Sequence, residues 1–546
     1  MLVSSLLIVI MDNTILNVAL RTIQDDLSAT QAQMQWATDS YMVVFAGLLI
    51  ASGVLGDRIG RRLMLLIGMV MFGIGSTACA FAHTPVELIV CRALLGVGAA
   101  AVQPQTLSII QNTFPPHERA KAIGAWSGAS GIAIALGPIV GGALIKYFWW
   151  GSVFLVNVPV TIAGFIGILL LVPESRDPRP GRFDLVGAVL SVLAMLLLVY
   201  GVIEGGNSGH WLRWNTGGMI AAGLLFGAVF IRYEQSIGDP MIDTALFRNR
   251  FFSSGVAVIA LIFFAITGAT FYLSYYLQAV RGYTPLATGV ALIAVAAGMM
   301  VTSMTAAALT RRAGANVVAG TGLMLFAVSM IAFIFATTTM PLWVLEIQIT
   351  LAGMGLGLTL TPATEAIMAA VPDHRAGSGA GANNTMRQLA SALGVAVLGS
   401  VLQLTFHHQF DTERPVQLAA ALDRPMAATT QLPESAQVGP EVKPESADSI
   451  TDALGFANRS IIVLQDRARQ TAAQPISEDT RNQQQARART LIEQFTTEAD
   501  HAFVDGIRVA SVLAAIGGLI GAAVAFGFLP RRRTVPTTPI RVLETA

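Results

Sequence analysis

Carboxylates stand inside apolar stretches of this 546-residue sequence that are long enough to cross a lipid bilayer. Asp12 lies near the middle of the stretch 2–23, and Asp39 and Glu365 lie in two other such stretches. Burying one charge there costs about 2.5–3.5 kcal/mol even on a lenient insertion scale. Such an acid is retained because it binds a cation, a proton or a partner charge. We therefore expect Asp12, Asp39 and Glu365 to exchange protons or cations; the sequence leaves open whether Glu365 faces a cavity or lies near the cytoplasmic end.

A guanidinium accompanies these acids, because Arg92 stands early in another apolar stretch, within LIVCRALLGVG. Arginine stays protonated in proteins, so inside a membrane it needs an anion or carbonyl oxygens as partners. We expect Arg92 to pair with Asp12 or Asp39 and to tune their charge. The alternative is an interfacial Arg92 whose charged end snorkels to water.

A glycine-rich charged segment, GVLGDRIGRR, joins two of the apolar stretches. Its glycines allow close backbone approach, and its acid can cap the following helix or pair with basic groups of another part of the chain. We expect it to hold a gate, and the alternative is an ordinary charged turn. Its residues are Gly53, Gly56, Asp57, Arg58, Gly60, Arg61 and Arg62.

A run of small residues, GIAIALGPIVGG, occupies a later apolar stretch. Small residues at helical spacing let a neighbouring helix approach closely, and a proline bends the helix. Such a face can seal or bend during a conformational change; simple helix packing is the alternative. Its defining residues are Gly131, Gly137, Pro138, Gly141 and Gly142.

The composition indicates an integral membrane protein. The chain is 54% hydrophobic and 12% charged, whereas soluble domains carry about 25% charged residues. Runs of about 20 apolar residues recur, which predicts an all-α protein with about 14 transmembrane helices. The net charge of +1 and the lack of a basic tract argue against nucleic-acid binding. Cys79 and Cys91 form no metal-ligand spacing or disulfide framework, and we expect them to be packing residues.

The distribution of Lys and Arg sets the orientation. Basic residues gather in alternate loops, which by the positive-inside rule places both termini in the cytoplasm and the chain in the inner membrane. The N-terminus lacks the basic region and cleavage site of a signal peptide. The first span begins almost at Met1, so we expect the native start to lie further upstream.

An internal repeat divides the chain. Pro104 followed by PHERAKAIG resembles Pro362 followed by PDHRAGSG at an offset of about 256 to 258 residues, and Arg61-Arg62 echoes Arg311-Arg312. Unless the similarity is due to chance, it predicts two six-helix halves around a midplane cavity, with two helices inserted between them. The expected parts are a first bundle at 1–172, inserted helices at 173–253, second-bundle helices at 254–405, an extracytoplasmic loop at 406–503, a last span at 504–528 and a tail at 529–546. The loop is polar and solvated; a lid or a contact with an envelope partner is the alternative, and 452–500 can form an amphipathic helix.

The motifs together resemble those of the major facilitator superfamily, in particular its fourteen-helix drug:proton antiporters of the QacA, SmvA and EmrB type. The resemblance rests on the segments above and on MDNTILNVAL at 11–20, WATDSY at 36–41 and YFWWGSVFLVNVP at 147–159. The chain departs from that pattern at Arg21 and Leu95, and at Asn383, Asn384 and Arg387, where the QacA type carries acids. These departures favour monovalent or neutral substrates over divalent cations.

Aromatic residues are candidates for substrate contact where they flank Asp39 or cluster in the apolar stretch 254–277, because aromatic faces attract planar or quaternary cations. The alternative for most of them is a lipid-facing or interfacial position. The candidates are Trp36, Tyr41, Phe264, Tyr272 and Tyr275.

The resemblance implies a proton-coupled antiporter that exports lipophilic, mainly cationic compounds by alternating access. We expect a monomer in the bilayer whose partners are protons and small lipophilic cations, with no cofactor and no metal. Export of an endogenous lipid, siderophore or antibiotic is the alternative, and a non-transporting membrane scaffold is a third. No Walker loop, nucleophile elbow or metal cluster occurs in the sequence, which argues against an enzyme.

Overall fold

The computed structural model describes residues 2–176, 184–208, 210–237, 240, 244–283, 285–409 and 478–531. These residues form helices joined by short turns, with a single isolated β-bridge between Gly314 and Arg531. In chain order the longer elements are α1 (Leu2–Asp26), α2 (Gln31–Ile59), α3 (Arg61–Ala80), α4 (Pro85–Thr113), α5 (Pro116–Tyr147), α6 (Ser152–Leu155), α7 (Asn157–Leu171), α8 (Leu185–Ser208), α9 (Trp214–Glu234), α10 (Arg250–Tyr275), α11 (Pro285–Ala313), α12 (Ala315–Ala332), α13 (Leu342–Ala370), α14 (Ala376–Gln409) and α17 (Glu478–Phe528). The elements that are not α-helical are the 3₁₀ turns η1 (Thr244–Arg248), η3 (Phe333–Phe335) and η4 (Asp373–Arg375) and the π-helical η2 (Tyr276–Val280).

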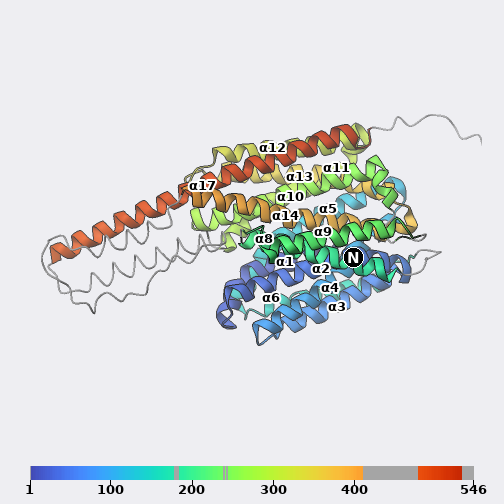
Figure 1. Ribbon diagram of the computed structural model, residues 1–546, viewed down its shortest axis with the longest axis horizontal. Helices are drawn as coiled ribbons and strands as arrows, with labels where there is room; N and C mark the ends of the chain where they lie inside the picture. The colour runs from blue at the N-terminus through green and yellow to red at the C-terminus, as the bar shows by residue number, and fades with distance from the viewer. Residues whose placement is uncertain are drawn as a thin grey trace, which may run out of the picture.

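The number of long helices agrees with the sequence prediction. Among the described residues, 12 helical segments are long and apolar enough to cross a membrane, and α1 and α5 bring the long segments to fourteen. The helix that contains the last span begins earlier than the predicted span. Hydropathy places it at 504, whereas α17 begins at Glu478 and extends beyond the ends of the other helices (Figure 1). Its first residues are mostly polar helix formers, which continue a helix without adding hydropathy.

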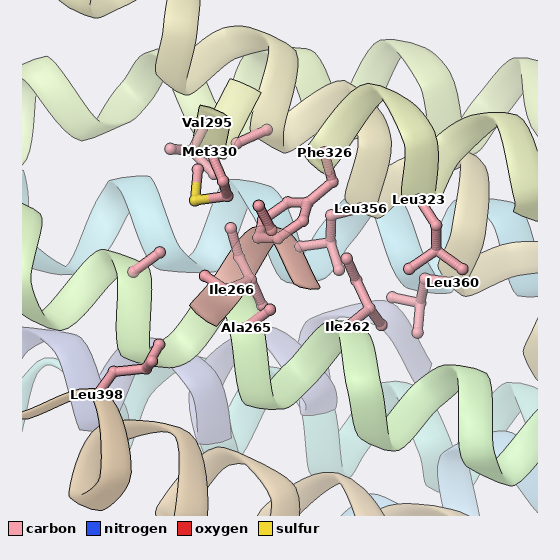
Figure 2. Close-up of a cluster of buried hydrophobic side chains, with 14 of the residues drawn as sticks. Ile262, Ala265, Ile266, Val295, Leu323, Phe326, Met330, Leu356, Leu360 and Leu398 are labelled. Atoms are coloured by element: carbon pink, nitrogen blue, oxygen red, sulfur yellow. The ribbon is translucent and has the colours of Figure 1, made fainter. Parts of the chain in front are cut away.

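The helices gather into two groups with separate apolar cores. One core joins α1 to α7, and the other joins α10 to α14 with α17 and also includes Ile50 and Val54 of α2 and Ala188 of α8. Figure 2 shows the second core, where Ile262 of α10, Phe326 of α12 and Leu356 of α13 converge. The inserted α8 packs against α2 and α14, while α9 packs on α8 and is mostly exposed on its outer surface, as expected for a helix facing lipid.

Small residues set how closely the helices approach one another. A Cβ atom on Gly394 of α14 would collide with the backbone oxygen of Phe264 in α10, and one on Gly98 of α4 would lie 2.6 Å from the Phe72 nitrogen of α3. Without a hydrophobic force between helices in lipid, such close backbone packing is a main source of stability.

We expect Gly394→Ala to destabilise the protein by about 1–3 kcal/mol, because α10 and α14 must separate to accept the methyl group. Gly527→Ala is the matched control, since a Cβ there meets nothing within 4 Å. Thermal unfolding of the detergent-solubilised variants measures the difference. Equal melting temperatures would show that the α10–α14 contact does not depend on Gly394.

Candidate functional site

The centre of the first helix group contains a fully buried ion pair. Asp12 of α1 and Arg92 of α4 are both 0% exposed, and the Arg92 Nη1 lies 2.5 Å from the Asp12 Oδ2. Asn157 of α7 donates to the Asp12 Oδ1 at 2.8 Å and to the Ser76 hydroxyl of α3 at 3.0 Å. The carboxylate therefore ties α1, α4 and α7 together. Removing one partner from such a pair typically costs about 3–5 kcal/mol, because the other charge stays buried.

Arg92 is held from a second side by α2. Its Nε donates to the Ala37 carbonyl at 3.1 Å, and its guanidinium lies 4.4 Å from the centre of the Tyr41 ring. The Tyr41 hydroxyl in turn donates to the Val9 carbonyl of α1 at 3.4 Å. The expected pairing of Arg92 is thus with Asp12, and the interfacial alternative does not hold. Tyr41 is a buried support for Arg92.

Asp39 lies apart from this pair, at the contact between α2 and the inserted α8. Trp36, one turn before it, stacks on Tyr200 of α8 with ring centres 5.5 Å apart. Tyr200 also lies close enough to Glu204 and Asp39 to interact electrostatically with both carboxylates. Two carboxylates and two aromatic rings therefore gather between α2 and α8. Tyr200 and Glu204 were not among the residues predicted from the sequence, although Glu204 is an acid near the end of an apolar helix.

Glu365 occupies a third place, near the end of α13, where the nearby charge is that of Arg311 from α11. Its Oε2 atom is buried and has no hydrogen-bond partner among the described residues. Glu365 therefore lies near one end of the bundle, and its exchange of protons or cations stays a prediction. This end of the bundle also carries the α2–α3 turn and the α13–α14 turn, and we call it the inner end.

At the inner end, Asp57 connects the two helix groups. Its Oδ1 accepts from the Gly377 backbone at 2.8 Å and its Oδ2 from the Ser378 backbone at 2.9 Å, so a residue of α2 caps the start of α14. Arg61 binds the same carboxylate, with its Nη2 2.6 Å from the Asp57 Oδ1. The sequence left open whether Asp57 caps the following helix or pairs with another part of the chain; it caps a helix of the second group.

Asp373 forms a second connection across the groups. Arg61 donates to its carbonyl at 3.0 Å, Gln111 to its Oδ1 at 3.2 Å and Arg119 to its Oδ2 at 3.2 Å. An apolar cluster from both groups lies beside these polar contacts, and we call it the apolar plug. It consists of Leu6, Leu107, Ile110, Ile123, Trp126, Met368, Ala376 and Ala380. The inner end is therefore closed by a polar layer and an apolar layer.

The glycines of the charged segment serve this closure. A Cβ on Gly53 would collide with the Gly377 carbonyl of α14, and one on Gly56 with the Gln105 side chain of α4. Gly60 has φ +119°, which suits glycine at the tight α2–α3 turn. The other two arginines of this segment, Arg58 and Arg62, are placed differently from Arg61. Arg62 donates to the Leu169 carbonyl at 2.7 Å within its own group, and Arg58 is partly buried.

The small-residue run of α5 packs mainly on α1, next to Asp12. A Cβ on Gly137 would collide with Thr14, and one on Gly141 would lie 2.8 Å from the Ile15 side chain. Gly131 instead faces α11 of the second group, where its Cβ would lie 3.2 Å from the Ala296 oxygen. Gly142 is partly buried in the same helix. The side chain of Pro138 lies outside what the structure describes.

The aromatic candidates of α10 occupy different environments. Tyr272 is 1% exposed in the core of the second group, where its hydroxyl lies 2.8 Å from that of Ser511 in α17. Phe264 is partly buried against that core. The Tyr275 side chain lies outside the described part. Contact of these residues with a substrate stays a prediction. Within the described residues, no group of three His, Cys, Asp or Glu side chains could hold a metal ion.

Comparison with known proteins identifies the family. The family model described as Major Facilitator Superfamily matches residues 2–395. The chain is 34% identical to the multidrug efflux pump LfrA of Mycolicibacterium smegmatis, over 79% of this chain and 88% of that protein. It is 33% identical to the methyl viologen resistance protein SmvA of Salmonella typhimurium, over 82% and 90%. It is also 34% identical to the tetracenomycin C resistance and export protein of Streptomyces glaucescens, over 72% and 74%.

Solved structures share the fold at low identity. The human organic anion transporter MFSD10 superposes with a TM-score of 0.56 at 14% identity, covering 74% of this chain and 92% of that one. A bacterial homologue of the human lysosomal transporter Spinster gives a TM-score of 0.51 at 16% identity, covering 96% of both. The motif-based prediction of the family is confirmed, and the chain belongs to the Major Facilitator Superfamily.

Proposed function

We propose that this protein is a proton-coupled antiporter that exports lipophilic, mainly cationic compounds across the cytoplasmic membrane. The observation that carries the proposal is the fully buried pair of Asp12 and Arg92, bonded to Asn157. The multidrug efflux and resistance proteins among its relatives support the same role. We place the inner end in the cytoplasm with both chain termini, and treat the monomer as the working unit.

Protonation of Asp12 is the coupling step in this proposal. A neutral Asp12 no longer balances Arg92, whose guanidinium stays charged. Because an unbalanced buried charge costs several kcal/mol, the contacts between α1, α4 and α7 must rearrange or water must enter. A single proton thereby changes the relative stability of two arrangements of the helices, which is what a coupled transporter requires.

Asp39 is the proposed attraction for a cationic cargo. Glu204 lies on the facing helix, and the stacked rings of Trp36 and Tyr200 add surfaces that favour planar cations. Trp36 is 42% exposed, so a lipophilic compound can reach this contact from the surface of the bundle. The inserted α8 then contributes half of a cation-attracting surface.

Alternating access requires the inner end to open. Its polar layer consists of charge-assisted hydrogen bonds that Asp57 and Asp373 accept, and water can replace these bonds when the groups separate. Each apolar core lies mostly within one helix group, so each group can move largely as a rigid body. The arrangement described here is the one with the inner end closed.

A second candidate is export of a compound that the cell itself makes. It is favoured by the relative named as a tetracenomycin C resistance and export protein. Both candidates use the same helices and the same proton step. Comparison of the medium and the envelope lipids of a deletion strain with those of its parent distinguishes them, because only the second candidate predicts a missing endogenous compound.

Asp12→Asn should abolish ethidium transport driven by an imposed pH difference in proteoliposomes, while the protein stays folded. Asparagine keeps the acceptor for Asn157 but has neither the charge that balances Arg92 nor a site for the proton. Asp25→Asn, an exposed acid of the same helix, is the control and should transport normally. Undiminished transport by Asp12→Asn would remove Asp12 from the mechanism.

Asp39→Asn should reduce transport of the cation ethidium about tenfold more than that of the neutral dye Nile red, because only the cation gains from the carboxylate. Initial rates of both dyes in the same vesicles measure the ratio. Ser40→Ala, which removes a neighbouring hydroxyl, is the control. Equal losses for the two dyes would assign Asp39 a structural role.

Asp57→Asn should open the inner end. The asparagine oxygen could accept from only one of the Gly377 and Ser378 N–H groups, its NH2 would face the other, and the charge pair with Arg61 would be lost. We expect a cysteine introduced by Ala380→Cys, in a chain lacking Cys79 and Cys91, to react about tenfold faster with a maleimide. Arg62→Gln, whose contacts stay within one group, should leave the rate unchanged. An unchanged rate in Asp57→Asn would show that this carboxylate does not hold the closure.

A further inference from the structure

Arg387 of α14 stands at the contact between the two helix groups. Its guanidinium lies 5.4 Å from the ring centre of Trp126 in α5 and 4.4 Å from that of Phe263 in α10. Asn383 and Asn384 precede it by one helical turn and therefore share its face of α14. One face of α14 thus carries the Arg387 guanidinium and the amides of Asn383 and Asn384 at the contact between the two groups.

The charge of Arg387 is not balanced within the described part of the chain. The residue is 8% exposed, and its one hydrogen bond there is to the Asn384 Oδ1 at 3.3 Å, with no carboxylate in ion-pair range. Arg92 and Arg61, the other deeply buried arginines, each bind an aspartate at 2.5 Å and 2.6 Å. The rings of Trp126 and Phe263 offset only part of the cost of burying this charge, which no carboxylate balances among the described residues.

The neighbouring amides are unpartnered as well. Both polar atoms of Asn383 and the Nδ2 of Asn384 are buried without a hydrogen-bond partner among the described residues. Buried amides are nearly always hydrogen-bonded in native proteins, so several orphan atoms beside an unbalanced charge indicate a missing partner. The guanidinium and the two Nδ2 groups are donors and only the Asn383 Oδ1 is an acceptor, so the best partner is mainly an acceptor, and the charge of Arg387 favours a negative one.

The position along α14 is central. Helix α14 begins at Ala376, and a rise of about 1.5 Å per residue places Arg387 roughly 16 Å from that end, about half of the roughly 30 Å hydrocarbon thickness. Trp126 belongs to the apolar plug, and its indole Nε1 donates to the Thr106 hydroxyl at 3.0 Å. Arg387 therefore lies next to the apolar plug, on its side away from the inner end.

We propose that Arg387, with the amides of Asn383 and Asn384, binds the carboxylate of an aromatic acid, and that the rings of Trp126 and Phe263 contact its aromatic part. The planar fork of arginine matches a carboxylate with two parallel hydrogen bonds. The inference rests on the proposed export function and deepens it, because it adds acidic and zwitterionic aromatic compounds to the cargo. It also gives a cargo that carries both charges two separate contacts, Arg387 and Asp39.

Binding of a matched pair of probes to the purified full-length protein tests the site. 1-Pyrenebutyrate carries the carboxylate, and 1-pyrenebutanol replaces it with a hydroxyl; both are followed by quenching of tryptophan fluorescence. We expect wild type to bind the acid about tenfold more tightly than the alcohol. Arg387→Gln should abolish this preference, Arg387→Lys should keep part of it, and Arg250→Gln, which removes an exposed arginine, should leave it intact.

Two results would overturn the site. One is equal affinity of wild type for the acid and the alcohol, which needs no variant and is informative even where Arg387→Gln does not fold. The other is an undiminished preference for the acid in folded Arg387→Gln, because that variant has no positive charge at 387. Binding is measured without a gradient, so failure of pH-driven ethidium transport would refute the proton coupling and leave this site intact.

Discussion

A charge inside the low-dielectric centre of a helix bundle must be balanced, and this constraint governs the structure. Asp12 balances Arg92, and Asp57 balances Arg61, each at hydrogen-bond distance and almost without exposure. The first pair holds helices within one group, whereas the second lies where the groups meet. Protonation of Asp12 therefore alters helix packing within the first group. Replacement of the partners of Asp57 by water alters how the two groups are positioned relative to each other.

Contacts within a helix group cost more free energy to break than the contacts between the groups. Within each group, apolar side chains and close backbone contacts at positions such as Gly98 and Gly394 leave little room for relative movement. Between the groups at the inner end, Asp57 and Asp373 bind backbone amides and basic side chains that water can also satisfy. Because the net free energy of a hydrogen bond to a charged group is about 1.5–3 kcal/mol, separation of the groups is easier than disruption of either core.

The sequence predicted those features that depend on one segment or on a strict rule of burial. The length of apolar runs gave the helices, and the cost of a buried charge singled out Asp12 and Arg92. Proximity between distant segments has no such local signal, so the contact of Trp36 with Tyr200 and the role of Asp373 emerged only in three dimensions. Hydropathy likewise placed the start of the last span at 504, because it measures transfer to lipid and not the helix propensity of the polar residues after Glu478.

The arrangement of charges bears on how one chain can serve many substrates. In our proposals the acids Asp39 and Glu204 lie between α2 and α8, and the unbalanced Arg387 lies at the centre between the groups. A dication entering the centre would be repelled by Arg387, whereas a monocation can be attracted at the α2–α8 contact without approaching it. A zwitterion can use both contacts. Selection by the placement of charge, with aromatic rings as adaptable apolar surfaces, admits many shapes and still discriminates by charge.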